Sequence, residues 1–146
     1  AARGAAYGLL QRGMRVALVN RTVARAADIA AHFGSGATAH AWTDLATLMP
    51  RAELLVNCTA LGMAGKPALE VDLAPLARGA VVYDIVYVPL ETPLLAKARQ
   101  RGHRVVDGLG MLLHQAGYGF RKWFGGEPRV TRELRALVEA DIVGKR

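Results

Sequence analysis

Residues 16–25 read VALVNRTVAR, and this stretch indicates the class of fold. An apolar run typical of a buried strand stops at Asn20, and a helical pattern begins directly after it. Thr22 is suited to cap that helix, which the pattern carries to Phe33 with Gly34 just beyond its end. A strand that leads straight into a helix is the repeating unit of an α/β protein.

The same alternation continues along the chain. Apolar strands are predicted at 53–58, 80–87 and 103–108, with a short extended piece near 37–41. Helices are predicted from about Asp44 to Pro50 and at 92–101, 110–124 and 131–143, whereas 59–67 is typical of a loop. Continuous Val/Leu/Ile strands separated by helices predict a doubly wound parallel sheet, so the fold class is α/β.

The composition excludes several classes of protein. No apolar run is long enough to span a membrane, and the first residues lack a signal-peptide pattern, so we expect a cytoplasmic protein. The single cysteine, Cys58, excludes an internal disulfide. The four histidines lack the spacing of a zinc site, so no metal is expected.

The net charge of +7 suggests an anionic partner, but the Lys and Arg residues are scattered. That distribution fits a solvated basic surface or a small phosphorylated ligand better than nucleic acid, which favours a basic stripe with aromatic residues.

The end of the first strand narrows the choice of ligand. In doubly wound sheets ligands bind beyond the carboxyl ends of the strands, and an Asp or Glu after the second strand of a dinucleotide fold selects NAD. Asn20 stands at that point, so no carboxylate repels a 2′-phosphate, while Arg21, Arg25 and Thr22 offer donors to phosphate oxygens. The stretch therefore predicts NADP(H), although a capped helix with two surface arginines explains it equally well by itself.

The glycine-rich phosphate loop of dinucleotide folds is absent. The chain begins at Ala1 rather than Met, in what is typical of the middle of a helix, so we expect the loop and the strand before it to lie upstream in a longer protein.

Four motifs carry a family resemblance: NRTVARA (20–26), NCTALGM (57–63), YDIVYVPLETPLL (83–95) and GLGMLLHQAGYGFRKWFG (108–125). In order and spacing they resemble the C-terminal half of shikimate dehydrogenases. That family reduces 3-dehydroshikimate to shikimate with NADPH, in the pathway to aromatic amino acids. The resemblance implies a Rossmann-like sheet that lacks its first strand and the N-terminal substrate domain. It also implies an NADP-binding domain at 1–108 and, at 109–146, helices that lead back toward that missing domain.

The resemblance assigns roles residue by residue. Cofactor-binding positions are Ala1, at the tail of the phosphate loop, and Asn20, Arg21, Thr22, Arg25, Thr59, Ile85 and Gly108. Substrate-binding positions are Tyr87 and Gln115, a phenol and an amide suited to a polyhydroxylated acid. From the pattern alone, Thr59 starts a turn, Ile85 is core, Gly108 is a turn glycine, Tyr87 lies at a rim and Gln115 faces solvent.

The chain departs from the family in a few places. Cys58 replaces a usual Ala and is interpreted as inert packing, and Gly117 and Gly119 should each cost their helix about 1 kcal/mol. Asp84 is a candidate for orienting its loop, and Met63 and Met111 are expected in the core. The family's catalytic Lys and Asp belong to the missing domain, so we expect no catalytic residue here and no activity of the fragment alone.

Three alternatives stay open. The first is a quinate/shikimate dehydrogenase relative of broader substrate or cofactor range, the second a non-catalytic NADP-binding module, and the third a nucleic-acid binder. We expect a small-molecule substrate, no nucleic acid and no membrane as partners, and a homodimer is compatible with the sequence. Because the family's first strand lies between 14–20 and 53–58, we expect a sheet split there unless another chain fills the gap, with Leu112, Phe120 and Trp123 poorly covered.

Overall fold

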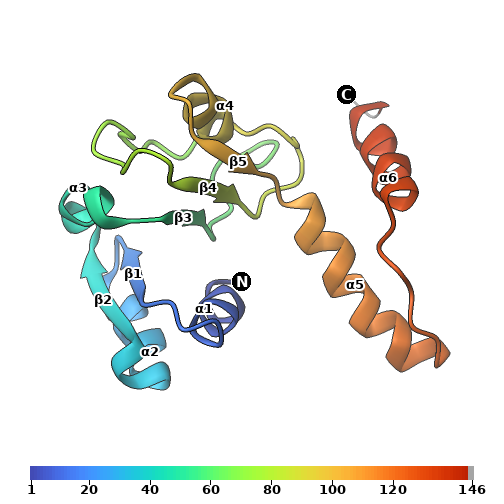
Figure 1. Cartoon of the computed structure of the whole chain (residues 1–146), viewed down its shortest axis with the longest axis horizontal. Helices are drawn as coiled ribbons and strands as arrows, with labels where there is room; N and C mark the ends of the chain where they lie inside the picture. The colour runs from blue at the N-terminus through green and yellow to red at the C-terminus, as the bar shows by residue number, and fades with distance from the viewer. Residues whose placement is uncertain (145–146) are drawn as a thin grey trace. The chain divides into compact units, whose positions relative to one another are not determined.

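The computed structural model describes residues 1–144 and follows the predicted alternation of strands and helices (Figure 1). The strands are β1 (Val16–Asn20), β2 (Ala37–Ala41), β3 (Leu54–Asn57), β4 (Val81–Asp84) and β5 (Arg104–Val106). The helices are α1 (Ala2–Leu10), α2 (Val23–Phe33), α3 (Leu45–Leu48), α4 (Pro93–Gln100), α5 (Leu109–Phe124) and α6 (Arg132–Gly144). Short 3-10 turns, η1 (Gly34–Gly36), η2 (Trp42–Asp44) and η3 (Met49–Arg51), join some of them.

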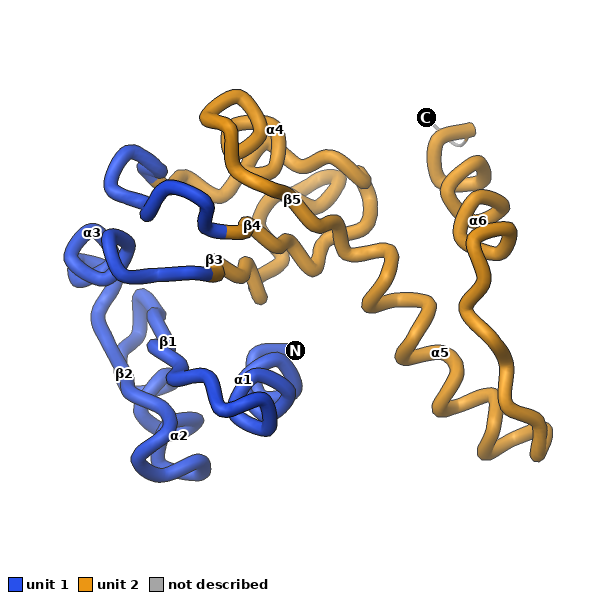
Figure 2. Tube along the Cα trace, in the orientation of Figure 1, with its two compact units in different colours: residues 1–53, 72–80 blue, residues 54–71, 81–146 orange. Residues whose placement is uncertain are grey.

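The described strands form two separate parallel sheets. One has the order β1-β2 and the other the order β3-β4-β5. The α/β class and the parallel pairing are confirmed, and the sheet is split between β1 and β3 as the sequence predicts. The chain correspondingly divides into two compact units, residues 1–53 with 72–80 and residues 54–71 with 81–146 (Figure 2).

In the first unit α2 packs against both β1 and β2. Its small residues Ala26 and Ala30 are buried, and Gly34 ends the helix at a φ of +66°, a conformation that glycine adopts without steric cost. The segment 72–80 joins this unit through a hydrogen bond from the Ala77 amide to the Met49 carbonyl at 3.1 Å.

In the second unit β4 is the central strand, and α4 packs on β4 and β5. Leu94, Leu95 and Ala98 form the buried face of α4. The helix begins as predicted, because the Thr92 hydroxyl accepts from the Leu95 amide at 3.3 Å and Pro93 occupies the first turn. α5 then leaves the end of β5 directly after Gly108.

Several details differ from the sequence-based expectation. β4 ends at Asp84 rather than at 87, because the Asp84 carboxylate accepts from the Val86 amide at 3.0 Å and turns the chain out of the ladder. The helix predicted from about Asp44 to Pro50 is shorter in the structure, because α3 ends at Leu48. Pro50 lies inside η3, since the first turn of a helix tolerates proline. Met63 is 38% exposed and is not a core residue, because it lies in the loop after β3. Met111, in the first turn of α5, is half-buried rather than fully in the core.

The long helix α5 has an uncovered aromatic face, as predicted. Phe120 is 43% exposed and Trp123 is 79% exposed, whereas Leu112 is half-buried. No helix among the described residues is both long and apolar enough to cross a membrane.

Candidate functional site

The corner between β1 and α2 is built by an asparagine rather than by the helix cap that the sequence suggests. Asn20, the last residue of β1, accepts from the Thr22 amide through its Oδ1 at 2.9 Å. Thr22 does occupy the N-cap position, but its hydroxyl makes no capping bond. The side chain of Asn20 therefore fixes the turn, and the Thr22 hydroxyl is left for another partner.

Two guanidinium groups flank this corner. Arg21 and Arg25 are both exposed, and neither guanidinium group forms a hydrogen bond or an ion pair with another described residue. The first turn of α2 contains no acidic residue. Unpaired N–H groups at a helix N-terminus together with forked donors favour an anion, so the corner suits a phosphate.

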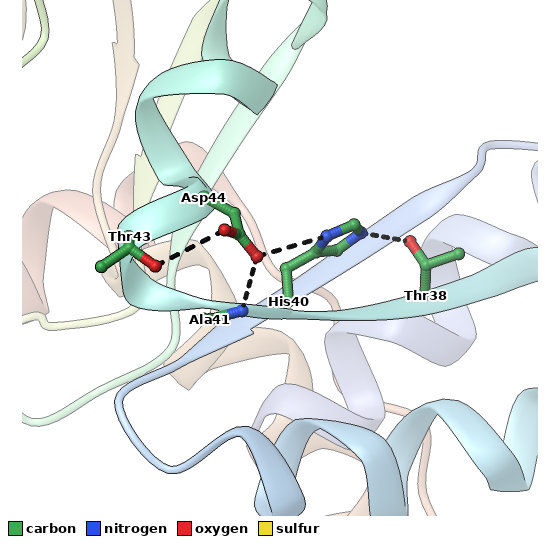
Figure 3. A network of polar contacts seen from close by, with 5 residues as sticks. All are labelled: Thr38, His40, Ala41, Thr43 and Asp44. Atoms are coloured by element: carbon green, nitrogen blue, oxygen red, sulfur yellow. Dashed lines mark hydrogen bonds and ion pairs between the residues drawn. The ribbon is translucent and has the colours of Figure 1, made fainter.

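The turn after the neighbouring strand β2 holds an acidic residue, Asp44, whose carboxylate is engaged locally (Figure 3). Asp44 accepts from the Ala41 amide through Oδ2 at 3.0 Å, and its Oδ2 lies 3.9 Å from Nδ1 of His40. The other ring nitrogen of His40 shares a hydrogen bond with the Thr38 hydroxyl at 2.8 Å. This carboxylate stabilises the turn after β2, and the chemistry of the β1–α2 corner stays cationic.

Ala1 stands at the N-cap of α1 and is exposed. Its carbonyl accepts from the Ala5 amide at 3.0 Å, and it has no polar side chain to offer. Its predicted role thus involves the backbone alone.

In the second unit, two buried polar side chains end neighbouring strands. Asn57 ends β3 and is 3% exposed, Asp84 ends β4 and is 0% exposed, and the two are register partners. Nδ2 of Asn57 donates to Oδ1 of Asp84 at 3.0 Å. A buried amide and carboxylate in direct contact leave neither group unpaired.

The same pair reaches two further hydroxyl groups. Oδ1 of Asn57 accepts from both the amide and the hydroxyl of Thr59, at 2.9 and 2.8 Å. Oδ2 of Asp84 accepts from the Thr92 hydroxyl at 2.7 Å. We call Asn57, Thr59, Asp84 and Thr92 the strand-end network; it ties together the loops after β3 and β4 and the start of α4.

Gly108 allows the end of β5 to approach the loop after β4. Its amide donates to the Val86 carbonyl at 3.2 Å, and a Cβ added to it would lie 2.1 Å from the Ile85 carbonyl oxygen. The Ile85 amide in turn donates to the Asn57 carbonyl at 3.2 Å. Thr59, Ile85 and Gly108 are thus brought to one edge of this sheet.

The two predicted substrate-binding residues are not joined by a hydrogen bond in the described structure. Tyr87 is half-buried in the loop after β4, three positions beyond Asp84, and Gln115 is exposed on α5. The side-chain amide of Gln115 forms no hydrogen bond with another described residue, so it is available to a ligand.

Cys58 follows β3 and is half-buried. Burial raises the pKa of its thiol, and the nearby Asp84 carboxylate raises it further. Because the thiolate is the reactive form, this thiol is a poor nucleophile at neutral pH, in agreement with an inert packing role. Among residues 1–144, no group of three or more His, Cys, Asp or Glu side chains is placed to hold a metal ion.

Asn57 and Thr92 make more contacts than the sequence indicates. Asn57 is not among the predicted site residues, and Thr92 is predicted only as a helix cap. An Asn at a strand end with a Thr two positions later is the pattern of a side-chain turn, and that signal is present in Asn57-Cys58-Thr59. That Asn57 also contacts Asp84 depends on strand register, which the sequence does not reveal.

Comparison with known proteins gives a consistent set of relatives, although no family model matches the chain. The chain is 58% identical to the shikimate dehydrogenase (NADP(+)) of Nitrobacter winogradskyi over 144 residues, 98% of this chain and 52% of that protein. It is also 58% identical to that of Rhodopseudomonas palustris strain HaA2 over 145 residues, 99% of this chain and 52% of that protein. The chain spans about half the length of the curated relatives it matches.

Solved structures agree. The quinate dehydrogenase of Corynebacterium glutamicum in complex with NAD matches 93% of this chain and 50% of that one, with a TM-score of 0.82 and 30% identity. The shikimate 5-dehydrogenase of Thermus thermophilus in complex with NADP(H) and shikimate matches 97% of this chain and 50% of that one, with a TM-score of 0.75 and 30% identity.

Proposed function

We propose that the chain, which belongs to the shikimate dehydrogenase family, is the NADP(H)-binding half of an enzyme that reversibly reduces 3-dehydroshikimate to shikimate. The observation that carries the cofactor choice is the β1–α2 corner: Asn20 ends the strand, and Arg21 and Arg25 stand exposed and unpaired beside it. A carboxylate at that point would repel a 2′-phosphate, whereas two guanidinium groups attract it.

The residues present fit the cofactor. In the first unit Arg21, Arg25 and the Thr22 hydroxyl would hold the adenosine phosphate, with Asn20 fixing the turn and Ala1 contributing backbone. In the second unit Thr59, Ile85 and Gly108 would accept the nicotinamide end, since a glycine at 108 keeps that backbone edge free of a side chain. NADPH supplies a hydride when bound, and the chain's part is to bind and orient it.

Tyr87 and Gln115 are proposed to bind the substrate's hydroxyl and carboxylate groups, because a phenol and an unpaired amide are suitable partners for a polyhydroxylated acid. The Lys and Asp that the family uses to move the proton do not fall on positions of this chain. We therefore propose that these 146 residues alone bind the cofactor without catalysing the reduction.

The proposal extends to the setting of the reaction. We assign the complete enzyme to aromatic amino-acid biosynthesis in the cytoplasm, acting on a small molecule without nucleic acid or membrane partners; a homodimer is compatible with the sequence. Residues 1–108 are proposed as the cofactor-binding domain, and 109–146 as helices that lead toward the substrate-binding part. The rival candidate is a quinate dehydrogenase that uses NAD, as the Corynebacterium glutamicum protein in its NAD complex suggests.

Equilibrium titration of the chain with NADPH, NADH and a short DNA duplex tests the proposal. We expect saturable binding of NADPH, clearly weaker binding of NADH, and DNA binding that disappears as salt is raised, as expected for a merely basic surface. Tighter binding of NADH would favour the NAD-dependent rival. DNA binding that persists in salt, without cofactor binding, would overturn the proposed class of function.

A further inference from the structure

The strand-end network has more contacts than a helix cap or a turn requires. Asp84 is fully buried and accepts three hydrogen bonds, from the Asn57 amide group, the Val86 backbone and the Thr92 hydroxyl. These donors belong to three different parts of the chain: the end of β3, the loop after β4 and the N-cap of α4.

The strand-end network forms hydrogen bonds with two loops, and each loop carries a proposed ligand-binding residue. Through Asn57 it holds Thr59, and the Thr59 hydroxyl accepts in turn from the Leu61 amide at 3.1 Å. Through its own Oδ1, Asp84 holds Val86, the residue before Tyr87. Nδ2 of Asn57 also donates to the Leu61 carbonyl at 3.1 Å.

The two loops also contact each other directly. The Ala64 amide donates to the Val88 carbonyl at 2.9 Å, and a Cβ added to Gly62 would lie 3.5 Å from the Thr92 side chain. The loop after β3 is therefore fastened to the loop after β4 at two places, one polar and buried and one along the backbone.

We propose that Asp84, with Asn57 and Thr92, is a positioning residue that holds two loops in a fixed arrangement: the loop after β3, which carries Thr59, and the loop after β4, which carries Tyr87. The nicotinamide side and the substrate side of the site then keep a fixed spacing. Asp84 acts through the two loops and touches neither ligand. The benefit of a fixed spacing rests on the proposed function, whereas the hydrogen bonds that hold the two loops are present in the described structure.

Thr92 offers the sharpest test, because its hydroxyl joins the network while its backbone starts α4. Thr92→Val removes the hydroxyl at nearly constant volume, and Thr92→Ser retains it. Thr131→Val is the matched control, since the Thr131 hydroxyl likewise accepts from the Leu134 amide at 3.2 Å at the start of α6 but has no bond to this network.

Amide hydrogen exchange of the chain without cofactor provides the first measurement. In Thr92→Val we expect exchange at Thr59, Leu61 and Val86 to rise roughly three- to tenfold, the effect of losing one or two hydrogen bonds, and Thr92→Ser to restore protection. Thr131→Val should change exchange only in α6. If Thr92→Val affects only the first turn of α4, the hydroxyl is a cap and the proposal fails.

Kinetics of a full-length protein containing this chain provide the second measurement. We expect Thr92→Val to lower kcat by about tenfold while the KM for NADPH stays within about twofold, because misplacement of reacting groups affects turnover more than uniform binding. Unchanged kcat would overturn the positioning role. Absence of NADP(H) binding in the wild-type chain would instead refute the proposed function, and the exchange result would stand independently of it.

Discussion

At the scale of single residues, Gly108 lies too close to backbone atoms to accept a side chain. Its φ is in the ordinary negative range, at −78°, so backbone freedom is not what requires glycine. The requirement is space, because a Cβ would lie 2.1 Å from the Ile85 carbonyl oxygen and 2.6 Å from that of Val86. Neither atom can rotate away, since both belong to the backbone.

Gly108→Ala should therefore push β5 and α5 away from the loop after β4. We expect a loss of about 1–3 kcal/mol of unfolding free energy, typical of overpacking, together with weaker NADPH binding. Gly110→Ala is the control, because nothing lies within 4 Å of its added Cβ and the helix should gain up to about 1 kcal/mol. Urea unfolding of both variants measures this, and a neutral Gly108→Ala would show that the close approach is not required.

Contacts between residues close in the sequence can be predicted from it, whereas contacts between distant residues cannot. The turn at Asn57 and the cap at Thr92 are local patterns, because both depend on atoms two or three positions apart. The Asn57–Asp84 contact joins residues 27 positions apart, and it exists only because β3 and β4 pair in one particular register. Periodicity predicts the strands but does not predict their register.

At the scale of elements, an ion pair joins α6 to Asp107, the residue after β5. Arg135 donates to Oδ2 of Asp107 at 2.6 Å, and this bond raises the pKa of the guanidinium group. Oδ1 of the same Asp107 accepts from the Leu109 amide at 3.0 Å at the start of α5. A single carboxylate thus fixes the start of one helix and the position of the next.

Arg135→Ala should release α6 without unfolding the unit. Because both side chains are partly exposed, we expect a cost of only about 0.5–1 kcal/mol, reduced further by salt. Arg132→Ala, on the same helix and without a partner among the described residues, is the control. Exchange rates along α6 would rise in the first variant only; equal rates in both would mean that other contacts hold the helix.

The elements themselves are largely predictable. Capping and termination signals at Thr22, Gly34, Thr92 and Gly102 place α2 and α4 correctly within a residue or two. The predicted end of β4 is too late, because Ile85, Val86 and Tyr87 continue the apolar pattern of the strand. The strand ends at Asp84 because its buried carboxylate accepts a hydrogen bond from the Val86 amide. Exposure of Phe120 and Trp123 follows from the family resemblance rather than from helical periodicity.

At the scale of the whole molecule, each of the two units carries its own set of proposed ligand-binding residues. The first contains the cationic corner after β1, and the second contains the strand-end network with Thr59, Ile85, Tyr87 and Gly108. The break between the two parallel sheets is predictable from strand order. The roles of the individual residues are not derivable from pattern alone, because Thr59, Ile85 and Gly108 each have an ordinary structural explanation as well.

Calorimetric titration of Arg21→Ala with NADPH and NADH shows whether Arg21 selects the cofactor. Arg15→Ala is the matched control, because Arg15 is also exposed but precedes the opposite end of β1. We expect Arg21→Ala to weaken NADPH binding by about 1.5–3 kcal/mol, the range for hydrogen bonds to charged groups, and to leave NADH binding nearly unchanged. Equal losses for the two cofactors, or a similar loss of NADPH binding in Arg15→Ala, would show that Arg21 does not select the cofactor.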